Sequence, residues 1–210
     1  MKIKILTLIS LVIIYILLKH YIPYWDKIVY PITLLVTFLH EFGHSFFALI
    51  TGWNVKAIEI NRDWSWYAVT AWGIKNLVLM WWYIWSAIFG NILIYIGFKK
   101  PKTSEMIIYF LAWLMIFVAI FWFNSIFSSL ILFALAGLLF VLAKYTSYDA
   151  IILQFLGISS ILYIIENFNV WPSSDLAKFS TFLPSSIWMI IWLLIVIVIT
   201  IFNFRLIFKK

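Results

Sequence analysis

Seven long apolar runs, separated by short polar stretches, constrain what this chain of 210 residues can fold into. A run of about 20 apolar residues is long enough to cross the hydrocarbon core of a bilayer as a helix. Of all residues, 66% are hydrophobic and only 11% are charged, which is far from the composition of a soluble domain. The sequence therefore predicts an all-α polytopic membrane protein with about six or seven transmembrane helices. The runs are Ile5–Leu18, Ile28–Ile50, Leu77–Phe98, Met106–Phe123, Ile126–Ala143, Ala150–Ile165 and Phe182–Phe204.

We expect residues 1–210 to form a single integral membrane domain, with a first helix and loop at 1–27 and a core at 28–204. The first run follows two lysines as in a signal peptide, but no small-residue cleavage site comes after it, so a retained helix is expected. Residues 53–72 differ in character, because two short β-branched and aromatic runs flank Asn61-Arg62-Asp63. This pattern predicts a short β-hairpin at the membrane surface. Gly52, just before it, suits the left-handed cap of the preceding helix.

The net charge of +7 does not indicate a nucleic-acid partner, because Lys and Arg stand singly or in short clusters at the ends of the apolar runs. Basic residues at such positions anchor helices at lipid headgroups. The lipid bilayer is therefore the expected environment, and a bacterial cell membrane is the expected location. The chain has no cysteine, so any metal ion must be bound by His, Asp or Glu.

The segment His40-Glu41-Phe42-Gly43-His44 places three ionisable side chains inside the second apolar run. Residues four apart lie on one face of a helix, so both imidazoles can bind one metal ion. Glu41 can then activate a water molecule bound to that ion. Such groups are costly in hydrocarbon unless they are paired, bound to metal or close to water. The motif therefore predicts a zinc site within the membrane, with His40 and His44 as ligands and Glu41 as the catalytic base.

A catalytic zinc ion usually has three protein ligands, and the remaining acidic residues supply the candidates for the third. Asp149, Glu166 and Asp175 remain once acidic residues at other helix ends and in the hairpin are set aside. The polar break 166–178 follows the motif helix by four spans, which places both on one side of the membrane, whereas Asp149 lies on the other side. We therefore expect Asp175, shortly after Pro172, to be the third ligand. Asp149 is the alternative if one span has been miscounted.

In these motifs the chain resembles the site-2 protease family of intramembrane zinc metalloproteases. Ser86-Ala87-Ile88-Phe89-Gly90-Asn91 is similar to that family's Ala-Gly-Pro-x-x-Asn element, with Ala and Ile where the family has Gly and Pro. Asn169-Val170-Trp171-Pro172-Ser173-Ser174-Asp175 is similar to its Asn-x-x-Pro…Asp-Gly element, with Leu176 in place of the final Gly. The pairing of Ser147-Tyr148-Asp149 with Ser173-Ser174-Asp175 is similar to the compact branch of the family, which lacks a PDZ domain.

The resemblance implies an enzyme that hydrolyses peptide bonds of transmembrane or membrane-adjacent protein substrates, with Zn²⁺ as its cofactor. It implies that Glu41 activates the zinc-bound water, that Asp175 completes the metal site and that Asn91 reaches the site or the substrate. It also implies that the hairpin edge presents a strand to the substrate.

Two other functions are alternatives: a proteolytically inert relative that binds a partner helix, and a small transporter. A transporter usually has paired repeats and scattered intramembrane charges, whereas this chain concentrates them in one pentapeptide. The intact Glu41 and both histidines disfavour the inert relative.

Overall fold

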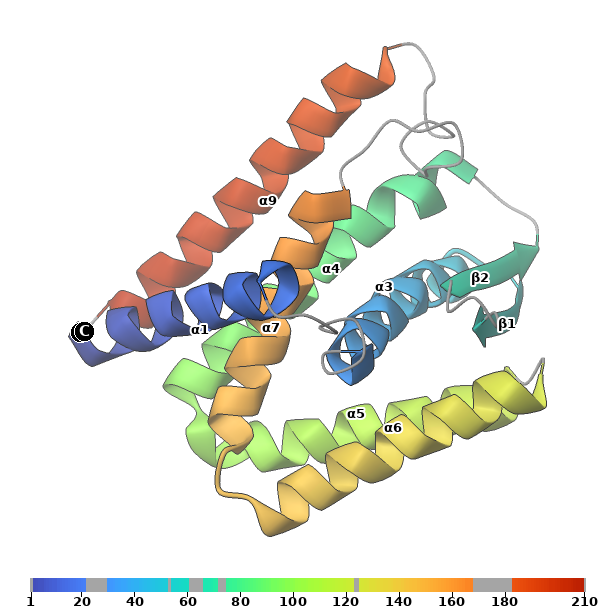
Figure 1. The fold of residues 1–210 in the computed structure, drawn as a ribbon. Helices are drawn as coiled ribbons and strands as arrows, with labels where there is room; N and C mark the ends of the chain where they lie inside the picture. The colour runs from blue at the N-terminus through green and yellow to red at the C-terminus, as the bar shows by residue number, and fades with distance from the viewer. Residues whose placement is uncertain are drawn as a thin grey trace.

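The computed structural model describes residues 2–21, 30–52, 54–60, 66–71, 75–122, 125–167 and 183–209. In these ranges, each predicted apolar run corresponds to one α-helix, and two strands follow the motif helix (Figure 1). The sequence predicts one break between Phe123 and Ile126 and another between Ala143 and Ala150. Each of these breaks separates two helices in the structure. The elements are α1 (Lys2–His20), α3 (Tyr30–Ile50), β1 (Asn54–Ile60), β2 (Trp66–Ala71), α4 (Lys75–Lys99), the 3₁₀ turn η1 (Pro101–Thr103), α5 (Ser104–Phe121), α6 (Ile126–Tyr145), α7 (Asp149–Asn167) and α9 (Ser185–Phe208).

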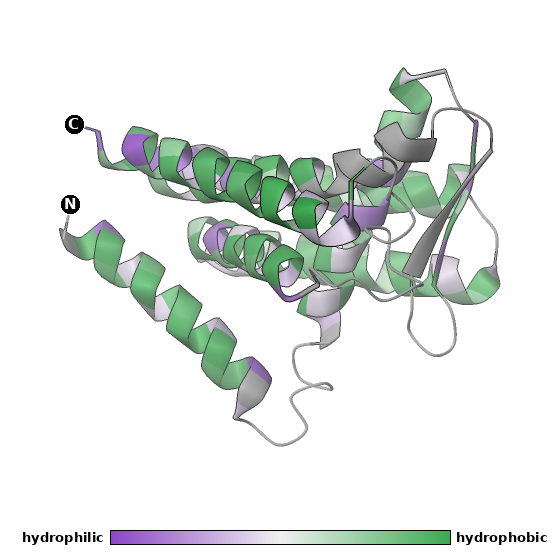
Figure 2. Cartoon of the chain, turned by 90° about the horizontal axis from the view of Figure 1, so that it is seen from above, coloured by the Kyte–Doolittle hydropathy of each residue, from purple (hydrophilic) through white to green (hydrophobic). Residues whose placement is uncertain are grey.

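Most of the described helices have the length and composition of membrane-spanning segments. Five of the described segments are long and apolar enough to cross a bilayer, namely Pro31–Ile50, Pro101–Phe121, Ile126–Tyr145, Asp149–Glu166 and Ser185–Phe208. Residues Ile84–Lys99 of α4 form a shorter apolar helix. Figure 2 shows that hydrophobic residues cover these helices and that hydrophilic residues are few along them. The predicted all-α polytopic membrane protein is confirmed.

The predicted hairpin is also confirmed. Strands β1 and β2 are antiparallel, with Asn54 opposite Ala71 and Ile60 opposite Trp66. At the far end of β1, the hydroxyl of Ser128 on α6 accepts a hydrogen bond from the Ile60 N–H at 3.0 Å. The start of the hairpin is fixed by Gly52, whose φ of +82° is the left-handed conformation expected just after α3.

Helices α4 and α7 approach each other closely through glycines. A Cβ atom added at Gly90 would lie 2.8 Å from the carbonyl oxygen of Gly157, and one added at Gly157 would lie 2.4 Å from the carbonyl oxygen of Gly90. One added at Gly97 would lie 2.6 Å from the carbonyl oxygen of Ala150. Small residues at such contacts allow helix backbones to meet in the membrane, where packing contributes much of the stabilisation. Gly90 belongs to the small-residue element identified in the sequence, and its partner is α7.

Helices α3 and α7 run in the same direction, and this determines which end of α7 lies near His40. Near the start of α3, Ile32 and Leu35 line one cavity together with Ile152 of α7. Towards its end, His40 lies against Tyr163 of α7. Early residues of α3 therefore face early residues of α7, and later residues face later ones. The carboxyl end of α7, which leads into the segment that carries Asp175, is consequently the end near His40.

Candidate active site

The motif lies on a regular part of α3, well inside both helix ends. His40, Glu41 and His44 are each at most 7% exposed. Their neighbours on α3 are mainly apolar, and Phe38 is completely buried in the cluster formed with α5 and α6. Three ionisable groups are therefore held together in apolar surroundings, where water contributes little to their solvation. Burial of this kind is tolerated when the groups bind one another or an ion.

The two imidazoles lie close together on one side of α3. The ring centroids of His40 and His44 are 5.5 Å apart, with an angle of 62° between the planes. Two histidines at zinc–nitrogen distances of about 2.0–2.1 Å in tetrahedral geometry would have centroids about 5 Å apart. The observed spacing is close to that value.

Glu41 lies next to this pair. Its Oε1 atom is 3.7 Å from Nε2 of His40. The carboxylate is thus on the Nε2 side of the His40 ring. Neutral imidazoles and a carboxylate form the donor set that zinc prefers when no thiolate is present.

Gly43 allows a tryptophan to pack directly on the backbone of the motif. A Cβ atom added there would lie 2.3 Å from Cδ1 of Trp85 on α4. The Trp85 ring also lies 5.0 Å from that of Phe46 and 5.9 Å from that of Phe89, measured between centroids. The glycine between Glu41 and His44 is therefore required by close packing of α4 on α3.

We expect Gly43→Ala to destabilise the protein by about 1–3 kcal/mol, because the added methyl group overlaps a large ring with little room to move. Gly137→Ala on α6 is the matched control, since a Cβ atom added there meets nothing within 4 Å. The control should be neutral or slightly stabilising, because Ala favours a helix over Gly by about 1 kcal/mol. Thermal unfolding of the two purified variants in detergent measures the difference. Equal stability would contradict the described packing of Trp85.

On α7, Tyr163 faces the motif. Its ring centroid lies 6.0 Å from that of His40, and the two planes are nearly perpendicular at 84°. Edge-to-face contacts of this kind hold aromatic rings in a defined orientation. Tyr163 was not among the predicted site residues.

The alternative ligand Asp149 is not near the histidines, which corrects that part of the sequence analysis. It is the first residue of α7, and Tyr163 follows fourteen residues later in the same helix. At 1.5 Å per residue, the two are separated by about 21 Å along the helix axis. Asp149 therefore cannot bind the metal ion that His40 binds. Its carboxylate lies in the first turn of α7, where a negative charge interacts favourably with the helix dipole.

The expected ligand Asp175 lies outside the described residues. Glu166, the remaining candidate, pairs with Lys19 of α1 and accepts a hydrogen bond from the Tyr15 hydroxyl at 3.0 Å. Within the described ranges, no group of three or more His, Cys, Asp and Glu side chains is arranged to hold a metal ion.

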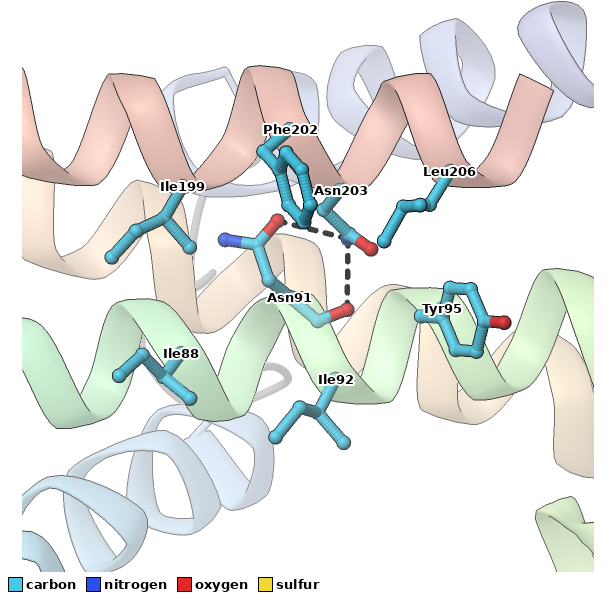
Figure 3. Close-up of a pocket in the computed structure, with 8 residues that line it drawn as sticks. All are labelled: Ile88, Asn91, Ile92, Tyr95, Ile199, Phe202, Asn203 and Leu206. Atoms are coloured by element: carbon cyan, nitrogen blue, oxygen red, sulfur yellow. Dashed lines mark hydrogen bonds between the residues drawn. The ribbon is translucent and has the colours of Figure 1, made fainter. Parts of the chain in front are cut away.

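Asn91 faces α9, as Figure 3 shows. Its Nδ2 atom donates to the Thr200 hydroxyl at 3.1 Å, and its Oδ1 atom accepts from Asn203 at 2.9 Å. Asn203 also donates to the backbone carbonyl of Asn91 at 2.8 Å. In this arrangement the Asn91 side chain joins two helices, while Trp85, six residues earlier on α4, contacts the motif at Gly43.

Sequence reasoning missed Trp85 and Tyr163, two aromatic residues that pack against the motif. Neither belongs to a recognisable motif, and the chain has 13 Trp and 11 Tyr, so aromatic identity alone carries little information. Gly43 is the sequence feature that could have indicated the Trp85 contact, because a glycine between two functional residues often marks the close approach of another segment.

Comparison with known proteins gives the family. The chain matches the family described as Peptidase M50B-like over residues 7–203, which is nearly its whole length. No curated protein and no solved structure matches it. Peptidases of this group are in general zinc metalloproteases embedded in membranes. The matched region includes the buried histidine pair on a membrane-spanning helix, and the chain therefore belongs to the Peptidase M50B-like family, within the site-2 protease group.

Proposed function

We propose that the protein is an intramembrane zinc metalloprotease that hydrolyses peptide bonds of membrane-embedded or membrane-adjacent protein substrates. The observation that carries this proposal is the geometry of the motif. Two imidazoles with centroids 5.5 Å apart and a carboxylate oxygen 3.7 Å from one of them are buried together in a membrane-spanning helix. Family membership supports the same conclusion.

His40 and His44 would bind the zinc ion through one ring nitrogen each. Asp175 is the proposed third ligand, because its segment begins at the end of α7 that lies near His40. When bound, zinc would supply a Lewis acid that polarises a carbonyl group and lowers the pKa of a water molecule towards 7. Three protein ligands leave one position open for this chemistry.

Glu41 would carry out the proton transfers. Its carboxylate would take a proton from the attacking water as the new C–O bond forms, and would then give it to the leaving amine nitrogen as the C–N bond of the peptide breaks. The low polarity around Glu41 strengthens its interaction with the developing charges.

The substrate must expose its backbone before it can react. A transmembrane helix hides its carbonyl groups in its own hydrogen bonds, so the cleaved segment has to unwind locally. Substrates with Gly, Pro or other helix-breaking residues near the cleavage site should unwind more easily. We propose such segments as the substrate class.

We expect purified protein to carry about one zinc ion per chain and to cleave a reporter transmembrane segment in proteoliposomes. His40→Ala and His44→Ala should each remove the metal and the activity. His20→Ala is the control, because it removes the remaining histidine of the chain from a different helix. Metal analysis by mass spectrometry and gel-based cleavage assays provide the two readouts.

Metal removal gives a second arm of the same experiment. A chelator should stop cleavage by the wild-type protein, and added zinc should restore it. Full zinc retention in a His40→Ala/His44→Ala double variant would overturn the proposed function.

A further inference from the structure

The groove between α4 and α9 is a cavity that the proposed mechanism does not use. It has a volume of about 270 Å³, and Figure 3 shows the side chains that line it. Helix α9 packs on α4, and the buried residues Asn91 and Asn203, which are hydrogen-bonded to each other, form the floor of the groove. Ile92, Phe202 and Leu206 also line it and are 46%, 62% and 41% exposed. Exposed apolar side chains of this kind meet lipid tails, which are as apolar as leucine, so the groove opens to the bilayer.

The groove follows one row of residues on α4. Ile88, Ile92 and Tyr95 line it. Lys99 comes four residues after Tyr95, and residues three and four apart share a helix face, so Lys99 continues the same row. From Ile88 to Lys99 the row is about 17 Å long at 1.5 Å per residue. The hydrocarbon of one leaflet is about 15 Å thick, which is half of the bilayer core. The row therefore has the length of one leaflet.

The end of this row is positively charged. The Nζ atom of Lys99 donates to the backbone carbonyl of Lys209 at 2.8 Å, which links α4 to the end of α9. This bond uses one of the three N–H donors of the ammonium group. Arg205, in the last turn of α9, is exposed. Glu105 and Asp149, the acidic residues described at this end of the molecule, belong to α5 and α7. The end of the groove is therefore suited to a phosphate group.

A hydroxyl group lies between the charged end and the apolar part of the groove. Tyr95 is one turn before Lys99, and Figure 3 shows its hydroxyl directed towards the carboxyl end of α4. This hydroxyl makes no hydrogen bond with any residue that the structure describes. Tyrosines near a membrane surface bury the ring in apolar surroundings and turn the hydroxyl to polar groups. Along its length the groove thus presents apolar side chains, then a hydroxyl donor, then an ammonium group.

We propose that the groove between α4 and α9 binds one anionic phospholipid of the bilayer. One acyl chain lies along Ile88, Ile92 and Phe202. The Tyr95 hydroxyl donates to an ester carbonyl, and the Lys99 ammonium pairs with the phosphate. The bound lipid touches both helices and so holds the end of α9 against α4. This inference does not depend on the proposed zinc site.

The size of the groove favours a lipid over a transmembrane helix of another protein. A helix segment 10 Å long and 10–12 Å in diameter occupies at least about 800 Å³. The groove has about a third of that volume, at 270 Å³. A partner helix can therefore lie over the groove but cannot fill it, whereas a single acyl chain can enter.

The first test measures the affinity of the purified protein for two lipids by native mass spectrometry. The lipids are palmitoyl-oleoyl phosphatidylglycerol, which is anionic, and phosphatidylcholine with the same chains, which is zwitterionic. Lys99→Gln should weaken binding of phosphatidylglycerol about fivefold, the effect of one basic residue at the headgroups, and leave phosphatidylcholine nearly unchanged. Lys144→Gln is the matched control, because Lys144 is an exposed lysine in the last turn of α6. Equal affinities of the wild type for both lipids, or equal effects of the two substitutions, would overturn the anionic site.

The second test examines the hydrogen bond to the ester. Tyr95→Phe should weaken binding of ester-linked phosphatidylglycerol by about two- to tenfold. It should not change the affinity for the ether-linked analogue, which has no carbonyl groups. Tyr109→Phe on α5 is the control and should bind both lipids as the wild type does. An equal effect of Tyr95→Phe on the two lipids would contradict the assigned contact.

The third test fills the groove. Ile92→Trp places a large ring where the acyl chain would lie, so it should weaken binding of both lipids by about tenfold. Ile190→Trp is the control, because Ile190 is 55% exposed on α9 and does not line the groove. Both variants should unfold at the wild-type temperature in lipid-free detergent, since both side chains are exposed. Unchanged lipid binding in Ile92→Trp would overturn the site, and a wild-type dimer without bound lipid would instead assign the groove to a second copy of the chain.

Discussion

Replacing Glu41 with Gln is expected to abolish cleavage of a membrane substrate while zinc remains bound. The amide has the size of the carboxylate but cannot accept a proton at neutral pH. Loss of a general base costs about 10²–10⁴-fold in rate. The carboxylate oxygen lies 3.7 Å from Nε2 of His40, while the two imidazoles are brought together by their four-residue spacing on α3. Single-turnover cleavage rates and zinc content of the same preparation measure the two effects separately.

Glu105→Gln is a suitable control for this experiment, because Glu105 is an exposed residue in the first turn of α5. It should cleave at the wild-type rate. A Glu41→Gln variant that is as fast as the wild type would mean that another group accepts the proton. A variant that loses zinc would instead assign Glu41 to metal binding.

Replacing Asp175 with Asn should weaken zinc binding strongly. Substituting a residue that only contacts a metal ligand typically lowers metal affinity by about 10–100-fold, and the loss of a ligand should exceed that. The substitution removes the only anionic ligand of the proposed set and leaves two neutral imidazoles. The position of α7 supports this expectation, since Tyr163 lies against His40 and the chain continues from the end of α7 towards Asp175. Zinc competition with a chelator of known affinity gives the ratio of dissociation constants.

Asp149→Asn is the paired control, because it makes the same chemical change at the other end of α7. Its expected cost is about 0.3–1 kcal/mol of stability from the lost interaction with the helix dipole, with zinc affinity unchanged. If instead Asp149→Asn loses zinc and Asp175→Asn keeps it, the proposed ligand set is wrong.

The helices and the hairpin could be predicted from the sequence because their signals are local. Apolar runs are bounded by polar residues, and Gly52 can adopt the left-handed conformation that ends α3. The pair His40 and His44 could be predicted for the same reason, since a four-residue spacing fixes a shared helix face.

The sequence could not show which side of each helix packs against the rest of the protein. Lipid and protein interior are both apolar, so a helix such as α9 shows hardly any hydrophobic periodicity that would mark its packed side. For this reason the sequence did not reveal that Asn91 faces Asn203, or that Tyr163 meets His40. The alternative role of Asp149 depended on a miscount of the membrane spans. Helices α3 and α7 run in the same direction, so the start of α7, which carries Asp149, lies at the end of α3 away from His40.

The glycine contact between α4 and α7 limits how a substrate can reach the site from the bilayer. Backbone atoms of the two helices touch at Gly90 and Gly157, and again at Gly97 and Ala150, so even a methyl group has no room between them. An unwound polypeptide is much wider than a methyl group. Lateral passage between α4 and α7 is therefore closed at these two contacts, and a substrate of the proposed protease would reach the histidine pair by another way.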